Sequence, residues 1–347
     1  MSVHDPSTPR KPRRLGLYLP FVALALAVAA WSGFWVWARG QAQTRMDAAV
    51  QAMNQAGWQL TWKERRVGGY PFRMDVTLTD VHVREPSGWG LEAPRVEGEA
   101  FMHAITHWLI AAPDGLTFVR PQGGAVAVSG RLIRASLTHL QSDPPSFSFE
   151  GVKLTFAPAP GAQPFALSSA DRVEFHLRAG PDDQGGVFAR LDNGKARLSG
   201  LFARVAGDKP ISIVWNSTLS KMSAFAGPDW PQAVRHWVDA GGSMTVRQAS
   251  VTAGEALLSS KAGSLDVDRS GRLRGVLDVS LRQAPRALDA MGAEGVIAPE
   301  AAEAAAAVAQ ARQGTGGVAQ ATLHFQAGRT TLGPVALGPA PKIYDPR

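Results

Sequence analysis

The sequence contains no cysteine, so it can form neither a disulfide framework nor a metal site with thiolate ligands. Catalytic signatures are also missing: there is no His-Glu-x-x-His zinc motif and no Gly-x-Ser-x-Gly nucleophile elbow. The glycine-rich segment 314–317 follows a predicted helix instead of preceding one, so its amides cannot cradle a phosphate. These absences favour a protein without enzymatic activity and without a cofactor.

Charge is only mildly unbalanced, and much of the surplus lies at the N-terminus. The net charge is +7, and the first 14 residues supply four positive side chains (Arg10, Lys11, Arg13 and Arg14) against Asp5. The rest of the surplus is spread thinly over the chain. This favours a solvated surface with mild attraction to anionic headgroups over a nucleic-acid partner.

Charged side chains are absent from Leu15 to Trp37. At about 1.5 Å per residue, a helix of this length crosses a hydrocarbon core of about 30 Å. Because the basic residues precede this run, we expect residues 1–14 to form a cytoplasmic tail and 15–37 a single-pass anchor in a bacterial inner membrane. The rest of the chain is then periplasmic. Trp31, Trp35 and Trp37 lie at the outer end, where indole N–H groups reach lipid headgroups.

A cleaved signal peptide is the alternative, because Ala27-Val28-Ala29 has the small-x-small form of a cleavage site. The apolar run continues well beyond it, which favours an uncleaved anchor. Met46, Val50 and Met53 then follow helical spacing up to Gly57, so residues 38–57 are expected to form a juxtamembrane helix.

From Trp58 onward apolar residues recur at every second position, as in Val173, Phe175 and Leu177. The phase slips at Asp80, as at a β-bulge. Turn signals separate the runs: Pro113-Asp114-Gly115, Gln122-Gly123-Gly124, 182–186, Asn193-Gly194, Gly207-Asp208 and Ser270-Gly271. The pattern predicts a mainly β protein with minor α: a long, curled antiparallel β-meander, shaped as a trough or half-barrel, behind the transmembrane helix.

The β-rich domain is expected over residues 58–341, followed by a short tail, 342–347. Helical spacing interrupts it near 230–240 and within 285–313. In the first segment Trp230, Val234, Trp237 and Val238 share one stripe, and Gly241-Gly242 ends the helix. The second contains two short helices, Pro285–Met291 and the alanine-rich Pro299–Arg312.

Two segments carry a resemblance to a known family. One is Arg66-Val67-Gly68-Gly69-Tyr70-Pro71-Phe72-Arg73, and the other is Leu337-Gly338-Pro339-Ala340-Pro341 near the C-terminus. They resemble the opening and closing motifs of a proteobacterial membrane-anchored family, the domain of unknown function 2125 (DUF2125). The resemblance implies no enzymatic activity.

The chain is also loosely similar to AsmA-like envelope proteins, through its N-terminal helix, its Gly-x-Pro turn and strands such as Gly271-Arg272-Leu273. This similarity implies a trough-shaped sheet and, in the large members, lipid passage through the periplasm. The present chain is too short to bridge two membranes by itself.

The residues of the first motif have a structural interpretation of their own. Gly68 and Gly69 allow backbone angles closed to other residues, and Pro71 cannot donate to a ladder, so it starts a strand at an edge or a turn. Tyr70 and Phe72 are then expected to cap the apolar end of the sheet.

Glu99, His103 and His107 are spaced four residues apart, as metal ligands on one helical face would be. The surrounding residues read as a strand, and no third distant ligand is evident. We therefore expect no metal site, with His103 and His107 as the candidates if one exists.

A long sheet with one apolar face must cover that face, and the predicted helices supply too little apolar area to do so. The sheet either curls shut or stays open as a groove, which beside a membrane would hold acyl chains. The large side chains expected to line it are Phe118, Phe147, Phe149, Phe156, Phe175, Trp215 and Phe325.

Three functions follow, in decreasing order of support. The first is a protein that binds or shields the acyl chains of a phospholipid or another envelope lipid. The second is a closed scaffold for envelope protein partners, and the third is a metal-dependent envelope hydrolase. The expected partners are thus the lipid bilayer, an envelope lipid and envelope proteins.

Overall fold

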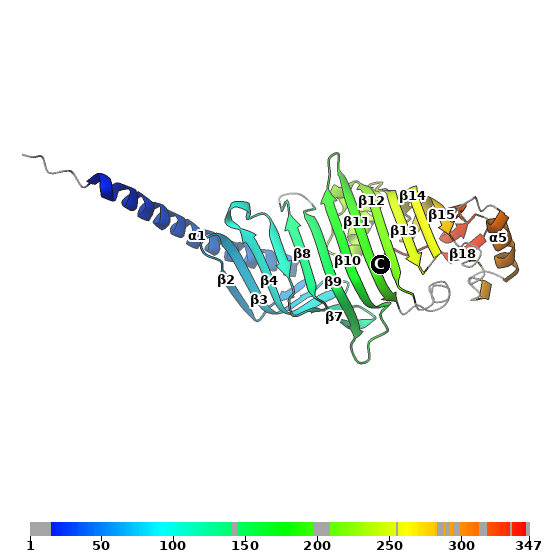
Figure 1. Ribbon diagram of the computed structural model, residues 1–347, viewed down its shortest axis with the longest axis horizontal. Helices are drawn as coiled ribbons and strands as arrows, with labels where there is room; N and C mark the ends of the chain where they lie inside the picture. Colours follow the sequence, from blue (N-terminus) through cyan, green and yellow to red (C-terminus); the bar gives the residue numbers. More distant parts are fainter. Residues whose placement is uncertain are drawn as a thin grey trace, which may run out of the picture.

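The computed structural model describes residues 15–140, 144–196, 209–254, 256–282, 288, 292–293, 299–311, 318–333 and 335–344. A single helix, α1 (Leu15–Gln55), leads into a large sheet and projects from it at one end (Figure 1). This helix is long and apolar enough to cross a membrane. It contains the predicted anchor and, up to Gln55, the predicted juxtamembrane helix without a break. The predicted N-terminal tail lies outside the described residues.

Within the described residues, one antiparallel sheet contains all the named strands. The strands are β1 (Gln59–Thr61), β2 (Glu64–Gly68), β3 (Arg73–Arg84), β4 (Gly90–Phe101), β5 (Trp108–Ala111), β6 (Leu116–Arg120), β7 (Gly124–Ser129), β8 (Leu132–Thr138), β9 (Ser146–Pro158), β10 (Leu167–Ala179), β11 (Gln184–Ala196), β12 (Ile211–Ser220), β13 (Met244–Ala253), β14 (Ala256–Val267), β15 (Leu273–Arg282), β16 (Val318–Gln326), β17 (Arg329–Leu332) and β18 (Val335–Pro339). The short helical segments are η1 (Met102–Ala104), η2 (Met222–Ala224), α3 (Trp230–Asp239) and α5 (Pro299–Ala311).

The sheet is a meander with one local fork. Its first strands, β1 and β2, pair with different parts of β3, and β4 pairs with β5 at one end and β6 at the other. The two branches meet again on β9, which pairs with both β8 and β7. From β9 to β18 each strand pairs with the next in the chain. The prediction of a long antiparallel β-meander is therefore confirmed.

Local irregularities set the phase of the strands. The β-bulge expected at Asp80 is wrong, because Thr79 pairs with Arg95 and Val81 with Ala93, so the register of β3 on β4 is the same on both sides of Asp80. Asp80 instead has a left-handed backbone, with φ +52°. Asn193-Gly194 was expected to be a turn, which is wrong. It lies inside β11, where Asn193 has φ +49° and the pairing shifts between Leu191 and Gly194. An Asn-Gly pair tolerates left-handed angles in a bulge as well as in a hairpin. Gly207-Asp208 lies outside the described residues.

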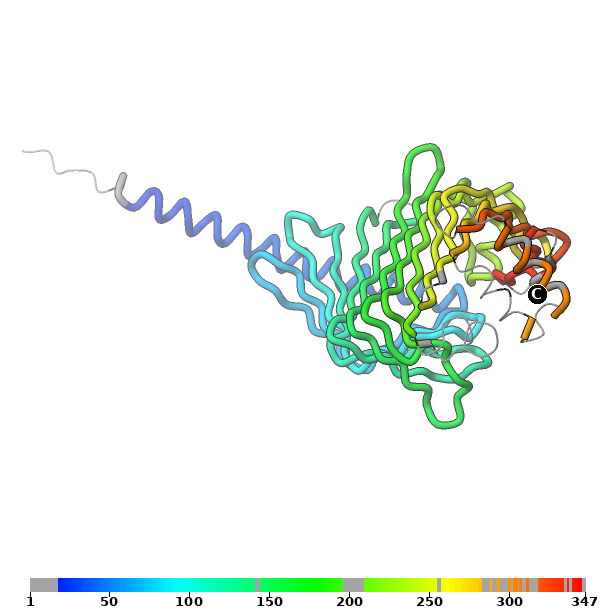
Figure 2. Tube along the Cα trace, turned by 45° about the vertical axis from the view of Figure 1, so that its right-hand side comes forward, coloured from blue at the N-terminus to red at the C-terminus, as the bar shows by residue number. Residues whose placement is uncertain are grey.

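The sheet curls along its length, as Figure 2 shows, with strand colours running in chain order around the curve. The C-terminal half of α1 packs on the first strands through Ala38, Ala42 and Met46. At the other end, buried side chains from β13 to β17 fill the interior of the curl: Val246, Leu265, Leu277, Val279, Phe325 and Leu332.

The helix predicted near 230–240 is α3, which connects β12 to β13. The Asp229 side chain caps it by accepting from the Gln232 backbone N–H at 2.9 Å, and Gly241 follows it with φ +77°. Val234 and Trp237 are buried as expected, whereas Trp230 is 46 % exposed. The alanine-rich helix is α5, and most of Pro285–Met291 lies outside the described residues.

Candidate functional site: the apolar face of the sheet

One row of directly paired residues runs from β2 to β16 on a single face. Directly opposite residues in a sheet point to the same side, so their side chains form a continuous band. The row is almost entirely apolar: Val67, Val76, Gly98, Ile110, Ala135, Phe149, Phe175, Ala189, Trp215, Ala249, Ser260, Val279 and Ala321. The Ser260 hydroxyl is buried and donates to the Ala262 carbonyl oxygen at 3.0 Å.

Two parallel rows widen this band. The second contains Trp108, Leu137, Phe147, Leu177, Val187, Ser217, Val246, Gly263, Leu277, Leu323 and Leu332. The third contains Ile133, Gly151, Val173, Leu191, Ile213, Val251, Leu258, Leu281 and Ala319. We refer to the three rows together as the apolar face. The apolar face runs from β2 to β17 by way of β5 and β8, and in Figure 1 these strands follow one another away from α1.

The opposite face carries charged residues. On it Glu150 of β9 lies between Arg134 of β8 and Arg172 of β10, and it accepts hydrogen bonds from both guanidinium groups. The Arg134 Nη2–Glu150 Oε2 distance is 2.6 Å. The hydrogen bond from Arg172, and then that from Arg134, lowers the pKa of the Glu150 carboxyl. This contrast between the faces is typical of a sheet that meets water on one side only.

Burial of the apolar face varies along its length. Near the C-terminal strands its side chains are buried, and Phe325 beside them is only 6 % exposed. From β8 to β11 the side chains of the first two rows are only partly buried, and Phe175 is 36 % exposed. The middle of the apolar face is therefore the least covered part of it.

The predicted lining residues fall into three groups. Phe147, Phe149, Phe175 and Trp215 lie on the apolar face, and the rings of Phe147 and Phe175 are 6.2 Å apart. Phe118 and Phe156 pack around Val128, Ile133 and Leu154, a cluster that Phe149 also joins. Phe325 belongs to the filled C-terminal interior, so it does not line an opening.

Aliphatic members of the apolar face were missing from the predicted lining. Leu177, Val187 and Leu137 occupy the same row as Phe147. Their signal was present in the sequence as period-two alternation, for instance at Val173, Phe175 and Leu177. The predicted lining contained only aromatic side chains, so it did not include them.

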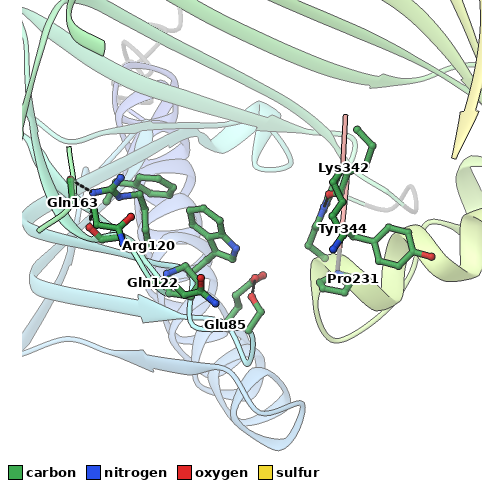
Figure 3. Close-up of a pocket in the computed structure, with 14 residues that line it drawn as sticks. Glu85, Arg120, Gln122, Gln163, Pro231, Lys342 and Tyr344 are labelled. Atoms are coloured by element: carbon green, nitrogen blue, oxygen red, sulfur yellow. Dashed lines mark hydrogen bonds between the residues drawn. The ribbon is translucent and has the colours of Figure 1, made fainter. Parts of the chain in front are cut away.

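A cavity of about 920 Å³ opens beside the curl, between strand turns on one side and the start of α3 with the C-terminal segment on the other (Figure 3). Trp89 and Phe118 line it and stack at 5.2 Å. The Arg120 guanidinium also lines it, but donates to the backbone carbonyls of Gln163 (2.7 Å) and Pro164 (3.1 Å). Arg120 therefore joins two loops of the protein, which leaves it poorly placed to receive an anionic ligand.

The residues considered for metal binding do not share a helix. Glu99 is on β4, where it accepts from the Arg73 guanidinium at 3.2 Å, while His103 is in η1. The His107 ring lies 6.1 Å from that of His139. Among the residues that the structure describes, no group of three or more histidines and carboxylates is arranged to hold a metal ion.

The glycine–proline motif joins the sheet to α1. Gly69 has φ +97°, the Tyr70–Pro71 peptide is cis, and Gly68 is ordinary strand. The expectation that Tyr70 and Phe72 cap the sheet is wrong, because the two side chains are 51 % and 70 % exposed. The indole N–H groups of Trp31 and Trp35 were expected to contact lipid headgroups. They donate instead to backbone carbonyl oxygens of the protein, that of Pro71 (2.8 Å) and that of Arg73 (3.0 Å).

Comparison with known proteins identifies the family. A family model described as an uncharacterized protein conserved in bacteria (DUF2125) matches residues 35–341. The chain belongs to the DUF2125 family. The match begins within α1 and ends after β18, so the apolar face and the glycine–proline motif both lie inside this DUF2125 domain. Neither the curated proteins nor the solved structures contain a match.

Proposed function

We propose that this DUF2125 protein is a non-enzymatic, membrane-anchored protein whose apolar face holds or shields the acyl chains of a phospholipid or another envelope lipid. The observation that carries the proposal is the apolar face itself, which is continuous along the sheet and only partly covered from β8 to β11. Exposed apolar bands of this size on a protein surface mark sites for apolar partners. Beside a bilayer, acyl chains are the abundant partner of that kind.

The proposed location follows from α1 and the charges that precede it. We propose that α1 spans the inner membrane of a bacterium with the N-terminus in the cytoplasm and the sheet in the periplasm. The four basic side chains before residue 15 support this orientation, because positive charges are retained on the cytoplasmic side. The sheet continues directly from α1, so its apolar face starts close to the bilayer (Figure 1).

Native mass spectrometry of the full chain, extracted in a mild detergent, tests the proposal. The wild-type protein should carry lipid that is released on activation. Since α1 can also retain lipid, two matched variants identify lipid on the sheet. Phe175→Asp places a carboxylate on the apolar face and should reduce the bound lipid severalfold. Phe188→Asp places the same charge on the next strand but on the opposite face, beside His176, and should leave the lipid in place.

Equal lipid in the two variants, or none in the wild type, would refute the proposal. A scaffold for envelope proteins is the second candidate, favoured by the filled interior from β13 to β17. For a scaffold, cross-linking in cells should trap one protein partner in good yield, and the yield should be the same for both aspartate variants.

A further inference from the structure

We infer that four exposed apolar side chains at the ends of the first strands insert into the bilayer leaflet beside α1. We call these residues the foot: Tyr70, Phe72, Phe101 and Ile105. The inference rests on the proposed membrane-spanning role of α1. It adds a second membrane contact, made by the sheet itself, and it does not depend on lipid binding by the apolar face.

Two turns come together to form the foot. Phe72 follows the turn between β2 and β3, and Phe101 ends β4 just before η1. The Met102 backbone N–H donates to the Phe72 carbonyl oxygen at 3.0 Å, and Arg73 is paired with Phe101. Phe72 and Phe101 are therefore neighbours, although they are far apart in the sequence.

The side chains of the foot are exposed, and the two turns that carry them are poor in charge. Phe72 is 70 % exposed, Phe101 53 % and Ile105 40 %. Residues 67–72 and 100–106 contain no Asp, Glu, Lys or Arg. Single exposed apolar residues are common on protein surfaces. A group of them on two adjoining turns without Asp, Glu, Lys or Arg indicates a surface that contacts a partner or a membrane in the functional protein.

Contacts with α1 place the foot at the depth of the lipid. The Trp31 indole donates to the Pro71 carbonyl, and the Tyr70 hydroxyl and Ser32 Oγ are 2.8 Å apart. Trp31 lies six residues before Trp37, the end of the uncharged run, so it is about 9 Å inside that end along the helix. A turn held at Trp31 therefore reaches the leaflet whenever α1 spans the membrane.

Charged groups begin where the bilayer would end. Arg73 directly follows Phe72, and its guanidinium pairs with Glu99 at 3.2 Å. On α1 the first charged residue after the uncharged run is Arg39. The foot would therefore lie among the acyl chains, and the charged groups that follow it would lie at the boundary with water.

The backbone of the turn is already adapted to an apolar surrounding. A carbonyl in hydrocarbon has no water to bind, so it must find a donor within the protein. Two of the turn's carbonyl oxygens accept from backbone N–H groups: Gly69 from Arg73, and Phe72 from Met102. Two others accept from indole N–H groups of α1: Pro71 from Trp31, and Arg73 from Trp35. The turn can therefore enter the leaflet without leaving these groups unpaired.

Site-specific fluorescence tests the inference, because the chain contains no cysteine and each introduced one is labelled uniquely. The variants Phe72→Cys and Phe101→Cys of the full chain, labelled with an environment-sensitive dye, are reconstituted in vesicles of phosphatidylethanolamine and phosphatidylglycerol that contain nitroxide-labelled lipid. Val28→Cys on α1 reports on the anchor. Val276→Cys, which is exposed on β15, reports on a surface away from the foot.

We expect lipid quenching at positions 72 and 101 to approach that at 28 and to exceed that at 276 severalfold. Quenching at 28 together with weak quenching at both 72 and 101 would overturn the inference, and the foot would then be a protein-binding surface. Weak quenching at 28 would instead refute the anchor. Two foot positions are labelled so that one misfolded variant, identified by circular dichroism, does not decide the result.

Discussion

Trp58 donates a hydrogen bond from its indole Nε1 to the Pro228 carbonyl oxygen at 2.8 Å, across 170 residues of chain. Trp58 lies just after α1, and Pro228 lies in the connection between β12 and β13. The bond therefore joins the first strands to the later part of the sheet. We predict that this bond helps to hold the curl of the sheet.

Replacing Trp58 by Phe should weaken this link while keeping most of the ring contacts. Because the bond is partly buried and neutral, we expect the free energy of unfolding to fall by about 1 kcal/mol. Urea unfolding followed by circular dichroism measures the change. Trp62→Phe is the matched control, since Trp62 packs against the Arg65 guanidinium near the same end of the sheet. Equal losses in the two variants would show that the bond does not stabilise the curl.

Two Phe→Asp variants should differ in stability, because one lies on the partly covered part of the apolar face and the other in the filled interior. Phe325→Asp buries an unpaired carboxylate among Val246 and Leu277, so we expect a loss of about 4 kcal/mol or more and an unfolded sheet. Phe175→Asp leaves the new carboxylate in contact with water and should cost about 1 kcal/mol. Thermal melting by circular dichroism measures both. Unfolding of both variants would mean that the middle of the sheet is closed in solution.

The Glu150 carboxylate should stabilise the fold in a pH-dependent manner. Its pKa is lower in the folded protein than in the unfolded chain, so its contribution is complete above the unfolded pKa of about 4.3. The contribution is lost as the pH falls through the lower, folded pKa. Because both arginine partners are nearly half exposed, we expect Glu150→Gln to cost only about 1 kcal/mol at neutral pH.

The difference between Glu150→Gln and the wild type should shrink as the pH falls below about 4. Urea unfolding at a series of pH values measures it. Glu97→Gln is the control: Glu97 pairs with Arg95 at 3.1 Å, and the Glu97 side chain is 47 % exposed against 14 % for Glu150, so the cost should be smaller. A difference for Glu150→Gln that stays constant down to pH 3 would contradict the assignment to its charge.

Gly69→Ala should strain the turn that touches α1. Gly69 has φ +97°, and an added Cβ would lie 2.7 Å from the Arg73 carbonyl oxygen, so we expect a loss of about 2 kcal/mol. Gly68→Ala is a close control, because a Cβ at Gly68 meets nothing within 4 Å. Differential scanning calorimetry of the two variants measures the contrast. Similar melting temperatures would show that the turn tolerates the substitution.

Local patterns in the sequence predicted much of this fold. The alternation along 173–177 assigned inward and outward faces. The slip at Asp80 marked a residue with a left-handed backbone, although the register of β3 on β4 does not shift there as it would at a bulge. Asn193-Gly194 shows the limit of such patterns, since the same left-handed angle serves a hairpin or a bulge. Only the pairing of neighbouring strands decides between them.

The candidate site was predictable as a type of surface but not as an arrangement. Phe175 and Phe325 have the same alternating context in the sequence, yet one is on the partly covered middle of the sheet and the other is in the filled interior. The exposed foot and its contacts with Trp31 and Trp35 have no local signal, because the partners are about 40 residues apart.

The sequence by itself determined the apolar helix, the strands and the face of each strand that is apolar, because these depend on periodicity within a few residues. The tertiary structure alone decided which apolar side chains are covered. Coverage depends on how strands distant in the chain align and curl, and on contacts such as that between Trp58 and Pro228, which no local pattern records.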